Sequence, residues 1–460
     1  MADTSKNMTV GSPVKLIILF SIPMLIGNVF QQAYNIADSV IVGQFLGAEA
    51  LASIGATSSL TFFFFAICNG FGSGGGIIVS QSFGKGDINQ VKNCIANTGY
   101  IMVILPFVIG TLAFICAPAF LRLLGTPEEI IHDAVVYTRL MSVGLFFVSI
   151  YNYVSSMMRA LGDSTTPLFF LIFSCFLNVG LDVLLVFVFK MGIFGAGLAT
   201  LISQFVSNIL CLGYAVLFNP YFKLTKKDLA FNTKVIAQTV KLGLPLSLQF
   251  AMIAISCMAL QRVVNNFGPL AVAAFTATGR IEQVIHQPYQ TLAAALSTFS
   301  GQNYGAKKYD RVISGYHKTM IMMAIFTAVM VPIIQIFGAQ ITAVFVSDAE
   351  VISMGATALR ITSIFYIMLG IIYVVRGVLN GLGDAFFALL NGVVEVIGRF
   401  TAPILLTMIP FIGVWGIWWS VGVVWSLAGI TAWFRYLYKK RKLYSTTEIS
   451  TTTEVKTEQN

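Results

Sequence analysis

The sequence is poor in charged side chains. Only 10% of its 460 residues are Asp, Glu, Lys or Arg, whereas a soluble globular domain carries about a quarter. Hydrophobic residues make up 57% of the chain. This composition excludes a water-soluble globule, and it also excludes a disordered chain, which needs low hydrophobicity. We therefore expect an all-α polytopic membrane protein without an additional soluble domain.

Residues that carry other kinds of chemistry are also scarce. The chain contains only 3 His, and its 6 Cys all lie in apolar stretches without a CxxC motif, which favours core packing over metal binding. The sequence contains no ATP-binding motif, no HExxH zinc motif and no Ser/His/Asp set, so we expect neither an enzyme nor a bound cofactor. The net charge of +9 is typical of cytoplasmic Lys and Arg that orient membrane helices, and nucleic acid is not an expected partner.

Long apolar segments, separated by Gly, Pro and charge clusters, predict twelve transmembrane helices. The expected ranges are 15–40, 51–81, 94–118, 133–158, 167–190, 193–218, 236–262, 270–300, 315–338, 353–377, 386–408 and 412–437. They define two six-helix lobes, at 15–218 and 236–438, which are joined by a polar basic linker at 219–235. A short N-terminal segment at 1–14 precedes the first lobe, and a basic tail at 439–460 follows the second. The tail is expected to be disordered from Ser445 onward because it is uniformly polar.

The distribution of Lys and Arg predicts the orientation in the membrane. If both termini are cytoplasmic, most of the 28 basic residues fall on the cytoplasmic side, and only Arg122, Lys190 and Arg262 face outside. This excess is what the positive-inside rule requires. The expected location is therefore the plasma membrane, crossed several times.

The two lobes are related by an internal repeat. A constant shift of 221 residues places Arg139 on Arg360, and it places the RALGD turn ending at Asp163 on the NGLGD turn ending at Asp384. Because each half has an even number of helices, the halves share one orientation and form a parallel repeat. Transporters use such repeats to move two helical bundles around a central site.

Acidic residues within the predicted helices are candidate functional groups, because a charge at mid-bilayer costs about 2.5 to 3.5 kcal/mol. Four are present: Asp38, Asp182, Glu282 and Glu395. The repeat places Ala259 opposite Asp38 and Pro403 opposite Asp182, so only the first half carries this pair of acids.

Polar neighbours of these two acids predict a cation site in the first lobe. Asn178 lies one helical turn before Asp182, Tyr34 lies one turn before Asp38, and Thr200 is expected at the depth of Asp182. Their carboxylate, amide and hydroxyl oxygens suit Na⁺, and the carboxylates could equally take up a proton. The alternative for Asp38 is a polar side chain that faces interfacial water.

The second lobe carries charges of a different kind. Glu395 and Arg399 have the i,i+4 spacing of a structural ion pair. Glu282 has no such partner, because Arg280 points to another face, and it is a candidate for meeting a cationic substrate or a second proton. His286 and His317 are interpreted as packing or loop residues. The Gly-rich stretch 70–76 indicates close helix packing.

Several of these motifs resemble the multidrug and toxic compound extrusion (MATE) family. The resemblance rests on YNIADSVIVGQFLGAEALASIG from Tyr34, on the RALGD and NGLGD turns, and on LNVGLD ending at Asp182. It implies a twelve-helix, V-shaped, two-lobed antiporter whose coupling site matches Asp38, Asn178, Asp182 and Thr200, with Gln31, Tyr34 and Asn152 lining the cavity beside it. Some members carry an acid after the proline that corresponds to Pro245, where this chain has Gln249 and Ile253.

These observations predict a secondary transporter that exports cationic amphipathic compounds against inward Na⁺ or H⁺. We expect it to act as a monomer on small molecules in the lipid bilayer. A flippase for a lipid-linked or polyanionic substrate is the main alternative, and it requires the arginines within the spans to face the cavity. A channel is disfavoured because acids confined to one lobe make a poor continuous pore.

Overall fold

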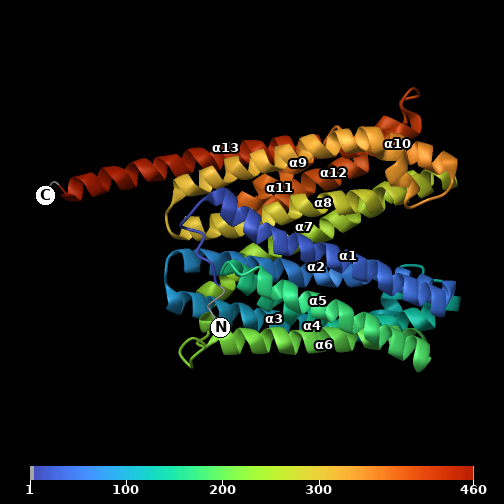
Figure 1. The fold of residues 1–460 in the computed structure, drawn as a ribbon, viewed down its shortest axis with the longest axis horizontal. Helices are drawn as coiled ribbons and strands as arrows, with labels where there is room; N and C mark the ends of the chain where they lie inside the picture. Colours follow the sequence, from blue (N-terminus) through green and yellow to red (C-terminus); the bar gives the residue numbers. More distant parts are fainter. Residues whose placement is uncertain (1–4, 459–460) are drawn as a thin grey trace. The chain divides into compact units, whose positions relative to one another are not determined.

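The structure is a computed structural model that describes residues 5–458, apart from the side chains of Ala48, Leu51, Ser59, Ala254 and 444–458. Within this range the chain is helical and contains no β-strand. In order, the elements are α1 (Pro13–Phe45), α2 (Ala48–Gly84), α3 (Ile88–Leu123), α4 (Glu128–Ala160), α5 (Thr165–Asp182), η1 (Val183–Val188), α6 (Gly192–Phe218), η2 (Pro220–Phe222), α7 (Thr233–Asn265), α8 (Gly268–Gly305), α9 (Tyr309–Ala343), α10 (Ala349–Ser363), α11 (Tyr366–Gly381), α12 (Ala385–Thr407), η3 (Gly413–Trp415) and α13 (Gly416–Glu458) (Figure 1).

These helices supply the twelve predicted spans. Among the described residues, 10 helices are long and apolar enough to cross a membrane by themselves. The pair α10 and α11 forms one further span that bends by 53°, where the sequence predicts a single helix over 353–377. The long helix α8, which carries Arg280 and Glu282, completes the set. The all-α polytopic fold is therefore confirmed.

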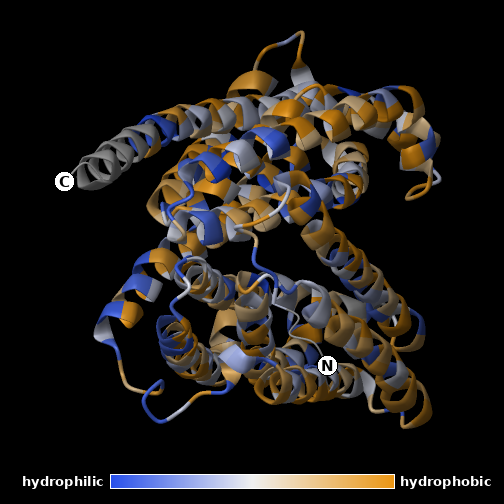
Figure 2. Cartoon of the chain, turned by 60° about the vertical axis from the view of Figure 1, so that its left-hand side comes forward, coloured by the Kyte–Doolittle hydropathy of each residue, from blue (hydrophilic) through white to orange (hydrophobic). Residues whose placement is uncertain are grey.

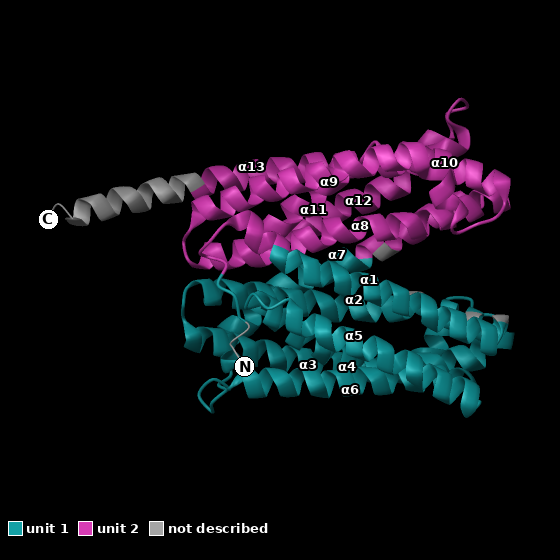
Figure 3. Cartoon of the chain, viewed as in Figure 1, with its two compact units in different colours: residues 1–7, 19–251 teal, residues 8–18, 252–460 magenta. Residues whose placement is uncertain are grey.

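The chain packs as two compact units (Figure 3). Unit 1 comprises Met1–Asn7 and Leu19–Ala251, and unit 2 comprises Met8–Ile18 and Met252–Asn460. The repeat in the sequence places all of α7 in the second half, whereas its residues up to Ala251 pack within unit 1. The start of α1 likewise packs within unit 2.

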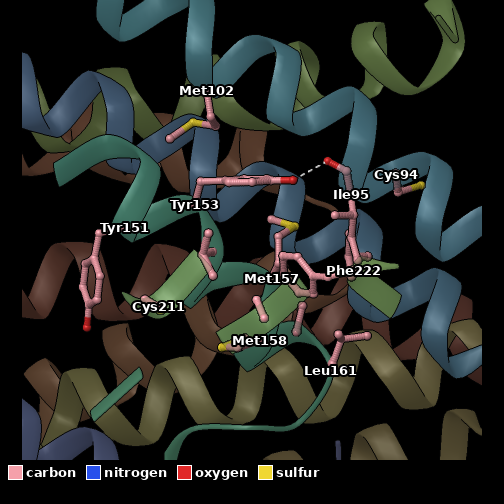
Figure 4. Close-up of a cluster of buried hydrophobic side chains, with 14 of the residues drawn as sticks. Cys94, Ile95, Met102, Tyr151, Tyr153, Met157, Met158, Leu161, Cys211 and Phe222 are labelled. Carbon is pink, nitrogen blue, oxygen red and sulfur yellow. Dashed lines mark hydrogen bonds between the residues drawn. The ribbon is translucent and has the colours of Figure 1, made fainter. Parts of the chain in front are cut away.

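Unit 1 has a core of aliphatic, aromatic and sulfur-containing side chains, contributed mainly by α2, α3 and α4, with further residues from α5, α6, η2 and α7 (Figure 4). Met102, Met157 and Cys211 are completely buried in this cluster. The phenol of Tyr153 donates a 2.6 Å hydrogen bond to the Ile95 carbonyl, which satisfies a polar group that would otherwise be costly to bury. Figure 4 shows this bond within the cluster.

Large apolar side chains also lie on the outside of the helices, as expected where lipid is the solvent. On α3, Phe107 and Ile115 are each 65% exposed. In Figure 2, hydrophobic residues cover most of the helical length, whereas hydrophilic residues gather in connecting segments. The polar linker is held against α3: Tyr100 donates to the Leu229 carbonyl at 2.6 Å, and Asn232 donates its N–H to Asn97 Oδ1 at 2.8 Å. Within the linker, hydrogen bonds from the Thr225 N–H and hydroxyl hold the pKa of Asp228 below its usual value.

The glycines of α2 permit close backbone contact with α7, as the sequence indicates. A Cβ at Gly74 would lie 2.7 Å from the Gly243 nitrogen, and one at Gly70 would lie 2.4 Å from the Ser247 nitrogen. The Ser247 hydroxyl donates to the Ile67 carbonyl at 2.7 Å across the same contact. Small residues at helix interfaces are the usual means of packing helices in a membrane.

Gly74→Ala is expected to destabilise the protein by about 1–3 kcal/mol, because the added methyl group collides with backbone rather than with a movable side chain. Gly55→Ala on the same helix is the matched control, since a Cβ there meets no atom within 4 Å. Thermal unfolding in detergent should show a lower Tm for the first variant and an equal or higher Tm for the second. Equal Tm values for both variants would contradict this packing.

At its C-terminal end α13 extends to Glu458, although the sequence predicts disorder from Ser445. The side chains from residue 444 onward lie outside the described residues, so the predicted disorder stays a prediction. Before that point α13 is fastened to the NGLGD turn, where Asp384 pairs with Arg435 at 2.9 Å and with Lys439 at 3.1 Å.

Candidate functional site

The polar residues predicted in the first lobe meet inside unit 1. Asp38 of α1 and Asp182 of α5 have their carboxyl groups within hydrogen-bonding reach of each other. Asn178 lies one turn before Asp182 and donates from Nδ2 to the Thr200 hydroxyl of α6 at 3.3 Å. Asp182 is completely buried, and Asn178 is 1% exposed. Three helices thus bring two carboxylates, an amide and a hydroxyl together.

Two phenols complete this polar group. Tyr34 has its hydroxyl within hydrogen-bonding reach of Thr200 and lies close to Asp38 and Asp182. Tyr137 of α4 is buried and also lies within electrostatic range of both carboxyl groups. The sequence analysis did not identify Tyr137. The available signal was a phenol near the start of a span that also carries other polar side chains, and this alone does not say that it faces α1 and α5.

The backbone changes its hydrogen-bonding pattern directly after Asp182. The α-helical part of α5 ends at Asp182, and η1 continues it as a π-helix over Val183–Val188. At its end the Phe189 N–H donates to the Leu184 carbonyl at 2.9 Å, an i→i−5 bond. Such π-helical turns frequently mark functional sites in helices.

The chemistry of the group suits a monovalent cation. The carboxylate, amide and hydroxyl groups all offer oxygen atoms, which Na⁺ prefers as ligands. The two carboxylates can instead take up a proton. Two carboxylates in contact repel each other in a medium of low dielectric constant, so one positive charge bound beside them is favoured. Among the described residues no group of three or more His, Cys, Asp or Glu side chains that could hold a metal ion is found. Any ion held here is thus bound mainly by two carboxylates and neutral oxygens.

Gln31 and Asn152, the other residues expected to line a cavity beside this group, have no hydrogen bond to its members within the described residues. Gln31 lies two turns before Asp38 on α1, and its Nε2 donates to Asn35 Oδ1 at 3.4 Å. Asn152 is half-buried on α4, and no hydrogen bond of its side chain is found in the part of the chain that the structure describes. Both remain candidate cavity residues.

In unit 2 the structure corrects the predicted partner of Glu395. Its ion pair within the described residues is with Arg376 of α11, which also donates to Asn391 Oδ1 at 2.9 and 2.6 Å. Arg399 instead donates to Ser256 Oγ at 3.4 Å and to Cys257 Sγ at 3.0 Å on α7. Glu395 and Arg399 remain within electrostatic range of each other, as the i,i+4 spacing predicts, but the close ion pair is made by the arginine on the neighbouring helix.

The other polar residues of unit 2 fall into two groups. Glu282 and His286 lie on α8, and the His286 ring packs edge-on against Trp425 at 5.6 Å between centroids. His317 lies on α9, with its Nε2 3.3 Å from Lys440 Nζ. His317 therefore belongs to a polar contact between α9 and α13.

Comparison with known proteins identifies the family to which the chain is similar. The MatE family model matches residues 23–184 and 245–409. "Probable multidrug resistance protein YpnP" of Bacillus subtilis is 29% identical over 443 residues, which are 95% of this chain and 97% of the relative. "Multidrug export protein MepA" of Staphylococcus saprophyticus is 25% identical over 422 residues, 90% of this chain and 91% of the relative.

A solved structure shows the same fold. A crystal structure of MATE in complex with MaL6 superimposes with a TM-score of 0.90 at 23% sequence identity, and the match covers 95% of this chain and 99% of that one. Because the family model matches well over half of the sequence, in both repeats, the chain belongs to the MatE family, the multidrug and toxic compound extrusion transporters.

Proposed function

We propose that the protein is a secondary active efflux transporter that exports organic, mainly cationic and amphipathic, compounds in exchange for inward Na⁺ or H⁺. It would do so as a monomer in the cell membrane, with both termini in the cytoplasm. The observation that carries the proposal is the contact between Asp38 and Asp182 beside the Asn178–Thr200 hydrogen bond. Asp182 is buried and Asp38 is half-buried, and two acids in contact on an apolar scaffold are costly unless they bind charge.

The coupling ion in this scheme enters from outside and neutralises part of the charge on Asp38 and Asp182. Its binding changes which arrangement of the helices around the site has the lower free energy. Tyr34 and Thr200 are within hydrogen-bonding reach of each other, so a change at the carboxylates reaches α1 and α6 together. For a monovalent ion the membrane potential contributes about 2.3 kcal/mol per 100 mV.

The substrate is proposed to bind near Gln31, Tyr34 and Asn152 of unit 1, and Glu282 is separately proposed as a residue that meets a cationic substrate. An organic cation and the coupling ion would then compete for the same carboxylates, directly or through rearrangement of α1. Such competition is sufficient for exchange, because each species leaves when the other binds.

The flippase alternative requires the arginines within the spans to face the cavity, and two of them, Arg139 and Arg360, bind helix backbone instead. Arg139 Nε donates to the Phe114 carbonyl at 3.4 Å and Arg360 Nε donates to the Gln335 carbonyl at 3.1 Å. Both side chains are thus used in helix contacts within their own unit. Arg376 is neutralised by Glu395. A strongly cationic interior, which a polyanionic substrate needs, does not arise from these residues.

Proteoliposomes test the proposal. Purified protein is reconstituted with a fluorescent organic cation, and dye movement is followed under an imposed Na⁺ gradient, an imposed H⁺ gradient, or neither. One of the two gradients is expected to accelerate transport several-fold over the condition without a gradient, which also identifies the coupling ion. Equal rates in all three conditions would contradict antiport.

A further inference from the structure

Unit 1 contains a cavity of about 420 Å³ that is separate from the acid pair. Its lining comes from Lys6, from the turn that follows α4, from the first residues of α5 and from Tyr214 of α6. Because consecutive helices run in opposite directions, the end of α4, the start of α5 and the end of α6 lie at one end of the unit. Asp182 closes α5 at the opposite end.

The backbone of Lys6 is fixed to the turn after α4. Its N–H donates to the Leu161 carbonyl at 3.0 Å. Gly162 has a φ of +88°, and a Cβ there would lie 2.2 Å from the Lys6 carbonyl oxygen, so the contact needs a glycine. The Lys6 side chain is exposed, and its ammonium has neither a hydrogen bond nor an ion pair within the described residues. A positive charge without a counter-charge is thus held at the cavity.

The carboxylate in the cavity wall is already occupied. Asp163 Oδ1 accepts the N–H groups of Thr165 and Thr166 at 3.0 Å each, and Oδ2 accepts the Thr166 hydroxyl at 2.6 Å. These bonds cap the start of α5, whose N-terminal dipole offsets the negative charge. Because Asp163 is only 2% exposed, Lys6 is the charged group that a ligand in the cavity can reach.

Aromatic rings line the rest of the cavity and extend to the surface of the unit. The rings of Phe169 and Phe170 lie 5.6 Å apart, and those of Phe170 and Tyr214 lie 5.7 Å apart. Phe169 is 67% exposed on a helix that is apolar enough to span a membrane. Aromatic residues at the ends of such helices are typical of the level of the lipid headgroups. The cavity therefore joins an uncompensated ammonium to an apolar surface that lipid can contact.

We propose that this cavity binds the phosphate headgroup of an anionic phospholipid, with Lys6 as the counter-charge and Phe169 against an acyl chain. The linker that follows α6 adds Lys223, Lys226 and Lys227 at the same end of the unit. In the proposed orientation this end lies in the cytoplasmic leaflet, where anionic lipids attract basic segments. A soluble anion would satisfy Lys6 but would leave the exposed ring of Phe169 without a partner, which favours the lipid.

Native mass spectrometry of the delipidated full-length protein tests this assignment. The protein is titrated with dioleoylphosphatidylglycerol, which is anionic, or with dioleoylphosphatidylcholine, which has the same acyl chains and no net charge. Lys6→Gln is expected to weaken binding of the first phosphatidylglycerol about fivefold, or about 1 kcal/mol. The affinity for phosphatidylcholine should change less than twofold. Lys6→Arg keeps the charge and should bind phosphatidylglycerol like the wild type.

Two further variants separate the cavity from the basic surface around it. Lys226→Gln removes an exposed lysine of the linker that does not line the cavity, and it should leave the affinity for phosphatidylglycerol within twofold of the wild type. Phe169→Ala should weaken binding of the same lipid, because the acyl chain loses an aromatic contact.

Three results would overturn the proposal. Equal losses for Lys6→Gln and Lys226→Gln would indicate a general attraction to the basic end of the unit. Equal losses for both lipids in Lys6→Gln would show that charge is not recognised. Displacement of phosphatidylglycerol from the wild type by excess inorganic phosphate would identify a soluble anion as the occupant. The assay needs no ion gradient and leaves Asp38 and Asp182 unchanged, so its result does not depend on the proposed antiport.

Discussion

Asp182→Asn is expected to reduce gradient-driven efflux to the level of empty liposomes. Asparagine has nearly the same shape, so the variant removes the negative charge while it leaves the packing of α5 intact. Loss of one charged ligand should weaken binding of the coupling ion at least about tenfold, or about 1.4 kcal/mol. Asp38→Asn should behave in the same way, since the two carboxyl groups are within hydrogen-bonding reach of each other. The measurement is initial dye efflux at several concentrations of the coupling ion.

Asp87→Asn is the control for this prediction. Asp87 caps the start of α3 and accepts the Gln90 N–H at 2.9 Å, and asparagine caps a helix about as well as aspartate. This variant loses the same charge at a helix end and should transport like the wild type. Driven efflux that survives in Asp182→Asn would refute the coupling role of the site.

Arg376→Leu is expected to lower the free energy of unfolding by about 3–5 kcal/mol, because it leaves the buried carboxylate of Glu395 without its counter-charge. The pair is well enclosed, with side-chain exposures of 11% for Arg376 and 6% for Glu395. Asn391 would lose a donor to its Oδ1 as well. Unfolding of detergent-solubilised protein, followed by loss of helical circular dichroism, measures the change.

The double variant Arg376→Leu/Glu395→Leu separates the cost of an unpaired charge from the loss of the pair itself. Removal of both charges should restore most of the lost stability, because apolar residues often replace a buried ion pair without penalty. A double-mutant cycle then gives the coupling energy. Equal destabilisation in the single and double variants would show that Glu395 is not the partner that matters.

The sequence predicts the spans and the polar faces of unit 1 well because both depend on signals within a single helix. Composition and apolar length predict the spans. Helical spacing places Asn178 with Asp182, and Tyr34 with Asp38, on common faces. Depth estimated from the helical rise then puts Thr200 at the level of Asp182, and the structure places its hydroxyl 3.3 Å from Asn178 Nδ2.

Contacts that depend on the rotation of one helix against another are not accessible in this way. Tyr137 reaches the carboxylates from α4, and Arg376 reaches Glu395 from α11. Neither relation has a fixed spacing in the chain. The bend between α10 and α11 was also missed, because Ser363, Ile364 and Phe365 include no Pro or Gly to mark it. Local patterns thus predict which faces are polar, but the packing of neighbouring helices decides which polar faces meet.

The close contact of Gly70 and Gly74 with α7 has a consequence for how the protein can be divided. The boundary of the sequence repeat does not coincide with the boundary of the packed unit. By sequence the beginning of α7 belongs to the second copy of the repeat, but by packing it belongs to unit 1. A fragment that stops at the linker would leave a glycine-lined groove on α2 uncovered. The duplicated halves are therefore not interchangeable modules. Unit 1 needs the beginning of α7 to complete its packing, so the first half can finish folding only after the start of the second half has been synthesised.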